Sequence, residues 1–188
     1  MESPDSTTKE EQVEHSIKIS LKNNSEREQI TRKLLEQLLA KYDLRKWIIC
    51  REVVIEQDAR AHSFPIITLS AWNAQSEESL LAQFLHEQIH WIETGNEDKM
   101  DQAIEELKIL YPEVPVGRPE GAINEKSTYR HLIVCRLEFL ALGELLGEDR
   151  AKEIILGNKN YTWIRRTTIE NGSNIDPIIE KYFPEALK

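Results

Sequence analysis

Residues 17–21, with the sequence IKISL, alternate between hydrophobic and polar side chains. Because successive residues of a β-strand point to opposite faces, this period of two predicts a short, half-buried strand. Two later runs, 47–55 and 64–69, are rich in β-branched and aromatic residues and predict two more strands. We expect these two runs to be neighbours in a small sheet.

Most of the remaining chain places its apolar residues three and four positions apart, the spacing of an amphipathic helix. The predicted helices are about 24–42, with Asn24 and Ser25 as its cap, then 77–94, 97–110, 126–146, 148–157, the region around Trp163, and 175–182. The pattern therefore predicts an α+β fold with a small β-sheet and a predominantly helical remainder. Residues 1–14 are expected to be a disordered tail and residues 15–188 a single domain.

The predicted helix 77–94 carries the motif with the clearest chemistry. Ser76 precedes it as a helix cap, and the sequence His86-Glu87-Gln88-Ile89-His90 lies in its second half. A spacing of four residues places both imidazoles on one face, one turn apart, where they can bind the same tetrahedral ion. This is the HExxH pattern, and it predicts that His86 and His90 are metal ligands with Glu87 beside them.

The expected metal is Zn²⁺, and the expected chemistry follows from its open coordination site. Two neutral imidazoles and one further ligand leave a fourth position for water, whose pKa the ion lowers to about 7. Glu87 is then placed to act as the general base that takes the proton of this water and passes it to a leaving amine. The predicted reaction is hydrolysis of an amide bond.

The stretch LHEQIHW, the strand predicted before it and a later helix with a carboxylate resemble the zincin metallopeptidases over residues 64–145. Within that superfamily the chain is most similar to the gluzincins, whose third zinc ligand is a glutamate. The resemblance implies a zincin-like domain with HExxH on a central helix, and zinc-dependent hydrolysis of a peptide or protein. It also implies that the strand 64–69 lies at the sheet edge and receives the substrate backbone.

The chain also resembles small bacterial proteins of unassigned function that carry HExxH. A second hypothesis is therefore a metal-binding or catalytically degenerate zincin that acts as an interaction or regulatory module. An open coordination position on the metal favours the hydrolase, and a filled cleft favours the module.

Three residues are candidates for the third zinc ligand. Glu138 is the preferred ligand, because a small residue, Ala141, follows it at the third position, as in gluzincins. His131 would then be a second catalytic residue beside Glu87 and would stabilise the oxyanion. His131 lies seven residues earlier, on the same face of the predicted helix, and is the first alternative, with Glu138 orienting a ligand. Glu125 is the second alternative, since its surroundings resemble those of the ligand in thermolysin-like enzymes, although it lies 35 residues after His90.

Other polar and aromatic residues could line a substrate site. Tyr129, Tyr161 and Trp163 are candidates for a substrate wall, with ordinary packing as the alternative. Arg165 and Arg166 could bind a substrate carboxylate, with a solvated pair as the alternative.

Composition and charge narrow the class of partner. The net charge of −9 and a pI near 5.2 provide no basic surface for nucleic acid. No apolar run approaches the ~20 residues of a membrane span, and the acidic N-terminus does not resemble a secretory signal, so we expect a cytoplasmic protein without membrane contact. Cys50 and Cys135 lie in apolar runs and are expected to be reduced core thiols. The sequence indicates no oligomeric state.

Overall fold

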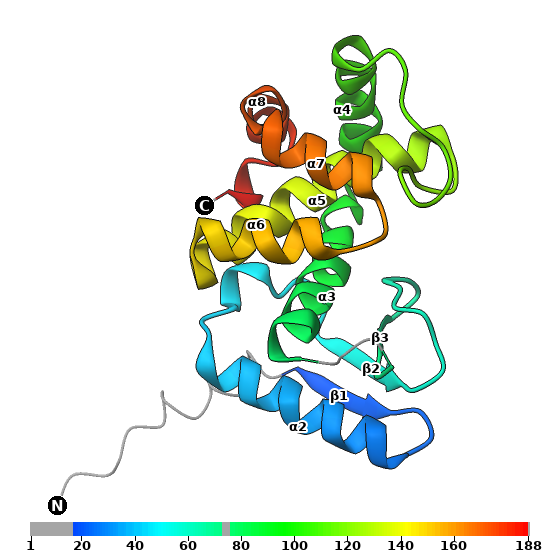
Figure 1. Ribbon diagram of the computed structural model, residues 1–188, viewed down its shortest axis with the longest axis vertical. Helices are drawn as coiled ribbons and strands as arrows, with labels where there is room; N and C mark the ends of the chain where they lie inside the picture. The colour runs from blue at the N-terminus through cyan, green and yellow to red at the C-terminus, as the bar shows by residue number, and fades with distance from the viewer. Residues whose placement is uncertain (1–16, 73–75, 188) are drawn as a thin grey trace, which may run out of the picture.

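The structure is a computed structural model that describes residues 17–72 and 76–187, so the predicted tail at residues 1–14 lies outside the described part of the chain. Three strands form one sheet in the order β1 (Lys18–Leu21), β2 (Glu52–Glu56) and β3 (Ile67–Ser70), and both neighbouring pairs are parallel. The predicted α+β fold is confirmed, with three short strands and a mainly helical remainder (Figure 1).

Two predicted strands begin later than the sequence indicates, and the run 64–69 forms a strand only from Ile67. The run 47–55 opens with a 3₁₀ turn, η1 (Arg45–Trp47), and β2 starts only at Glu52. The reason lies in contacts distant in sequence: the Trp47 side chain enters the core from η1, and the side chain of Gln88 pairs with the backbone of the segment before β2. The backbone groups of Ile49 and Cys50 are therefore hydrogen-bonded to a side chain and need no neighbouring strand.

Helix α2 (Glu26–Lys41) connects β1 to β2 and packs against both. It begins with a capping box, in which Ser25 accepts a hydrogen bond from the Glu28 backbone and the Glu28 carboxylate accepts one from the Ser25 backbone. The predicted cap and helix are both confirmed.

The connection from β2 to β3, residues 57–66, contains no helix. It must return from the end of β2 to the start of its parallel neighbour, and most parallel pairs use a helix for this. Here the connection runs along the outer side of β3, where the backbone N–H and C=O of His62 pair with those of Thr68. The path of this connection determines which of its residues lie near helix α3.

The helical part follows β3. It consists of α3 (Glu77–Ile89), η2 (His90–Glu93), α4 (Glu97–Leu110), α5 (Glu125–Leu146), α6 (Glu148–Gly157), α7 (Thr162–Glu170), α8 (Gly172–Tyr182) and η3 (Pro184–Ala186). Helix α3 runs between the sheet with α2 on one side and α5 with α6 and α7 on the other (Figure 1). No helix in the described ranges is long and apolar enough to cross a membrane.

Two details of α3 and α5 bear on the metal motif. The helix predicted at 77–94 is α-helical only to Ile89 and continues as the 3₁₀ turn η2, so His90 opens a tighter turn. Helix α5 is mostly buried between Thr128 and Leu142, packs directly against α3, and ends at Gly147 with φ of +86°, a conformation that favours glycine. The packing of these two helices brings their polar side chains together.

Candidate metal centre

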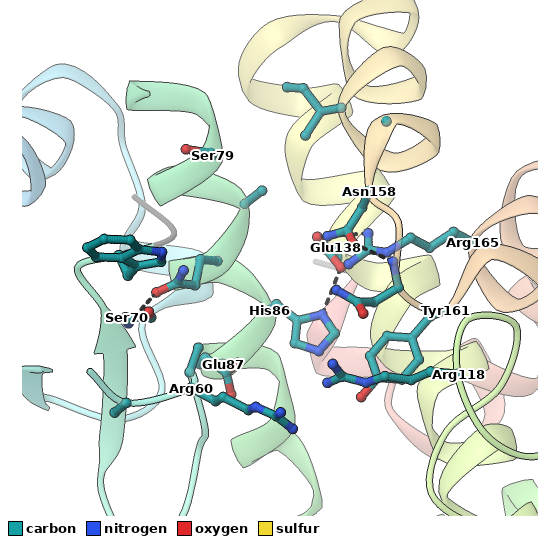
Figure 2. A pocket seen from close by; sticks show the side chains of 18 of the residues that line it. Arg60, Ser70, Ser79, His86, Glu87, Arg118, Glu138, Asn158, Tyr161 and Arg165 are labelled. Atoms are coloured by element: carbon teal, nitrogen blue, oxygen red, sulfur yellow. Dashed lines mark hydrogen bonds and ion pairs between the residues drawn. The ribbon is translucent and has the colours of Figure 1, made fainter. Parts of the chain in front are cut away.

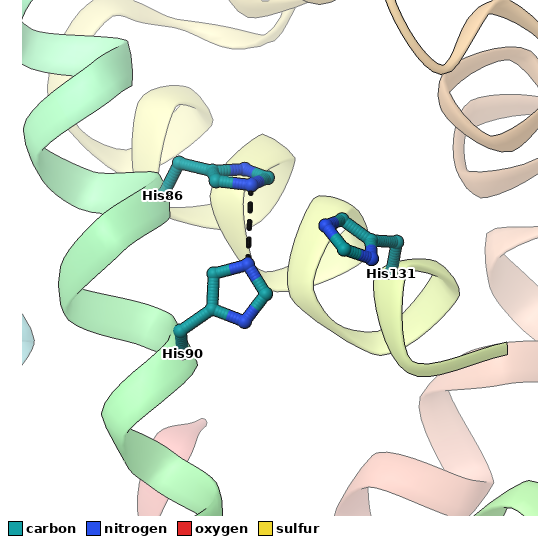
Figure 3. A group of neighbouring side chains, drawn as sticks. All are labelled: His86, His90 and His131. Carbon is teal, nitrogen blue, oxygen red and sulfur yellow. Dashed lines mark hydrogen bonds between the residues drawn. The ribbon is translucent and has the colours of Figure 1, made fainter. Parts of the chain in front are cut away.

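Three histidines from two helices meet at the packing surface of α3 and α5 (Figure 3). His86 lies on α3, His90 begins η2, and His131 lies on α5; one ring nitrogen of each lies within 4.8 Å of the others. The Nε2 atoms of His86 and His90 are 3.3 Å apart. Two nitrogens bound at about 2.0–2.1 Å to one tetrahedral zinc are separated by about 3.3 Å. The pair therefore has the spacing that such an ion requires.

Hydrogen bonds hold two of these rings in a defined orientation. The Glu138 carboxylate accepts a hydrogen bond from Nδ1 of His86 at 2.8 Å, and the backbone carbonyl of Ser127 accepts one from Nδ1 of His131 at 2.7 Å. A proton on Nδ1 leaves Nε2 of each ring as the nitrogen that can bind a metal. Carboxylate and carbonyl partners of this kind are typical of histidines that ligate metals.

The structure distinguishes the three candidates for the third ligand. His131 is grouped with both His86 and His90, whereas Glu138 is grouped with His86 and Cys135 and contacts the opposite nitrogen of His86. Glu125 is exposed in the first turn of α5 and belongs to neither group. The preferred set of His86, His90 and Glu138 is therefore not brought to one point, and the geometry favours His131.

Two of the three histidines have the protonation of metal ligands, and the third, His86, must lose a proton before its Nε2 can bind a metal. Burial opposes a charge on His86, but the Glu138 carboxylate raises the pKa of His86 well above its usual range. Burial, followed by the charge of His86, lowers the pKa of His131 to about 3 and that of His90 well below its usual range. At neutral pH both His90 and His131 therefore present a neutral imidazole, the form that binds metals.

Glu87 points away from the histidine pair toward the connection between β2 and β3. Its side chain is buried and accepts a hydrogen bond of 2.6 Å from the hydroxyl of Ser63. The indole N–H of Trp91 donates to the backbone carbonyl of the same serine at 3.0 Å. Ser63 was not singled out from the sequence, because only the path of the loop brings it to Glu87.

His86 and Glu87 both line a cleft of about 860 Å³ (Figure 2). Its walls come from α3, from the β2–β3 connection and from the segment between α6 and α7. Tyr161 belongs to the last of these, and its ring centroid lies 4.5 Å from that of His131. Its backbone has a φ of +59°, a conformation that costs energy for a residue other than glycine and often occurs at functional sites.

The other aromatic candidates for a substrate wall pack elsewhere. Tyr129 is fully buried and donates its hydroxyl hydrogen to the backbone carbonyl of Tyr111 at 2.6 Å. Trp163 packs edge-on against the ring of Tyr111. Of the three predicted aromatic residues, only Tyr161 lines the cleft.

Comparison of the chain with protein-family models, with curated proteins and with solved structures found no match.

Strand β3 is an edge strand, as the zincin resemblance implies for residues 64–69, but its outer edge is occupied. The N–H and C=O of Thr68 pair with His62, and the N–H of Ser70 donates to the side-chain oxygen of Gln83 at 2.7 Å. A substrate strand would need these same backbone groups. Around Thr68 the edge of β3 therefore lacks the free backbone N–H and C=O groups with which a substrate strand would pair.

Arg165 and Arg166 do not form the solvated pair considered from the sequence. Arg165 is buried and donates to Oε1 of Glu138 at 3.2 Å, whereas Arg166 is exposed and does not line the cleft. The charge of Arg165 lowers the pKa of Glu138 although burial alone would raise it. Arg165 therefore keeps ionised the carboxylate that orients His86.

Arg165→Met is expected to reduce the free energy of unfolding by about 3 kcal/mol, because loss of one partner leaves a buried charge less compensated. The loss should lie at the low end of the usual range, since His86 still contacts Glu138. Urea unfolding of the metal-free protein at pH 7 measures it. Arg150→Met is the matched control, because Arg150 pairs with Glu78 on the surface and such pairs contribute little. Equal losses in the two variants would contradict the prediction.

Proposed function

We propose that the protein is a zinc-dependent hydrolase that cleaves an amide bond, with His86, His90 and His131 as zinc ligands and Glu87 as general base. The observation that carries the proposal is the convergence of three imidazoles at the packing surface of α3 and α5, with His86 and the adjacent Glu87 both lining an open cleft. The HExxH spacing and the resemblance to zincins support it. Under this proposal His131 takes the ligand role first considered for Glu138.

A bound zinc ion would supply an open position for water and lower the pKa of that water. Glu87 would take the proton from the water and later deliver it to the leaving nitrogen. The hydrogen bond from Ser63 goes to Oε2 of Glu87, and Oε1 would then be the oxygen that takes part in this transfer. Tyr161 lines the cleft next to the histidines, and its hydroxyl would donate a hydrogen bond to the developing oxyanion.

Glu138 and Arg165 would not bind the metal themselves and would act on it through His86. Glu138 fixes the ring of His86 through Nδ1 and increases its basicity, and Arg165 holds Glu138 ionised. We also propose that the protein works in the cytoplasm, which the two free cysteines, Cys50 and Cys135, support.

The proposal predicts that about one zinc ion binds per chain and that hydrolysis depends on it. The test incubates the zinc-loaded protein with a mixture of short peptides and N-acyl amino acids in ¹⁸O-labelled water. Mass spectrometry should detect cleavage products with one labelled carboxylate oxygen. A chelator should abolish the products, and added zinc should restore them.

Zinc binding without incorporation of solvent oxygen into any product would contradict the hydrolase. That result would favour the alternative of a metal-binding interaction module. Absence of zinc binding would contradict the metal centre itself.

A further inference from the structure

Two arginines outside the histidine cluster line the same cleft. Arg60 comes from the β2–β3 connection and Arg118 from the segment between α4 and α5. Their side chains approach the space near His86 and Glu87 from opposite walls (Figure 2). Among the described residues neither guanidinium forms an ion pair, although the carboxylate of Asp58 also lines the cleft.

These arginines differ from the third arginine of the cleft. Arg165 is buried and neutralised by Glu138, so it has a structural partner. Arg60 and Arg118 are exposed, and their planar donors are free to form paired hydrogen bonds with an incoming carboxylate. Two unpaired arginines at the cleft also contrast with the overall net charge of −9.

Of the three proposed ligands His86 lines the cleft, so a bound zinc ion would add positive charge next to it. Three neutral histidines leave the full double charge of a zinc ion uncompensated, whereas a glutamate ligand would remove half of it. Glu87 and Asp58, which also line the cleft, would offset part of this charge, and Glu138 is already paired with Arg165. With zinc bound, the cleft would therefore have a local excess of positive charge, because Arg60 and Arg118 form no ion pair among the described residues, and this would favour an anionic substrate.

The occupied edge of β3 restricts the form of that substrate. Because Thr68 already pairs with His62, and the N–H of Ser70 with Gln83, an extended peptide cannot add to β3 as a further strand. Recognition must then depend on groups inside the cleft rather than on a backbone ladder.

We infer that Arg60 and Arg118 bind a carboxylate of the substrate, so that the protein acts on small acylated amino acids or on peptides cleaved near their C-terminal carboxylate. This inference rests on the proposed zinc hydrolase. It identifies the substrate class by its anionic end, and it makes the two arginines specificity-determining residues that contact substrate.

The test measures binding, so it does not depend on turnover. Zinc-loaded protein is titrated by calorimetry with the monohydroxamates of succinic and glutaric acid, and with the same two compounds carrying a terminal amide. The hydroxamate group binds zinc in all four, and only the terminal charge differs. At least one acid should bind about tenfold or more tightly than its amide, and this preference should shrink at high salt because the contact is electrostatic.

Substitution assigns the preference to particular residues. Arg60→Gln and Arg118→Gln should each weaken binding of the acid about three- to tenfold and leave binding of the amide unchanged. Arg166→Gln is the matched control, because this exposed arginine lies outside the cleft, and it should change neither affinity.

Equal affinity for acid and amide at both lengths, including no binding of any of the four, would overturn the inference. Equal weakening of acid and amide by the arginine variants would also overturn it. If a phosphonate-terminated analogue binds more tightly than the carboxylate-terminated compound, the two arginines recognise a phosphate, and the inference of a carboxylate is overturned. Zinc content is measured first: failure to bind zinc overturns the metal centre and this inference together, whereas an acid preference without any hydrolysis contradicts only the hydrolase.

Discussion

Glu87→Gln is expected to lower the rate of amide hydrolysis by ~10²–10⁴-fold while the protein keeps its zinc. Glutamine has nearly the same shape and can still accept the hydrogen bond from Ser63, but it cannot take a proton from water. The measurement combines initial rates on a substrate cleaved by the wild type with zinc content after dialysis. The rate should fall through kcat, because the lost step is chemical.

Glu78→Gln is the control for this variant, because Glu78 lies on the same helix, α3, and outside the cleft. Its rate should match that of the wild type. Comparable hydrolysis by Glu87→Gln and the wild type would contradict the role of Glu87 as base. Loss of zinc from Glu87→Gln would show that the carboxylate contributes to metal binding instead.

His131→Ala should reduce zinc affinity by more than about 100-fold, beyond the 10–100-fold losses typical of residues that only orient a ligand. Glu138→Gln should fall within that lower range, because it weakens the hold on His86 without removing a metal-binding atom. Competition with a chromogenic chelator measures both affinities. Thermal unfolding of the metal-free variants checks that each is folded.

His62→Ala provides the control, because His62 is exposed and contributes to the sheet edge only through its backbone. Its zinc affinity should equal that of the wild type. A larger loss in Glu138→Gln than in His131→Ala would return the ligand role to Glu138. Full retention of zinc by both variants would direct attention to Glu125.

The sequence predicted those parts of the fold that depend on local patterns. Helices α4 and α6 have the bounds expected from their apolar spacing, and α2 begins at the predicted cap. The strand predicted over the first half of the run 47–55 is absent, because Trp47 and Gln88 make contacts there with residues distant in sequence. Periodicity contains no information about such contacts.

Local patterns and contacts distant in sequence also contributed differently to the prediction of the candidate metal centre. The spacing of His86 and His90 is local to one helix, so their proximity could be predicted. His131 and Glu138 share one face of α5, and only the way α5 packs on α3 decides which is level with the metal-binding nitrogens. Residues supplied by loops, such as Arg60 and Ser63, could not be found without the path of the chain.

The occupied edge of β3 also has a consequence for the behaviour of the protein in concentrated solution. An unpaired edge strand is a template on which a second chain can add, and it is a common starting point for aggregation. At Thr68 the loop through His62 already fills this position. The opposite edge strand, β1, begins with an exposed lysine, Lys18, which pairs with Glu52 on β2, and charged side chains on an edge discourage such pairing of sheets. The connection that shapes the cleft thus also protects the small sheet from joining the sheet of another molecule.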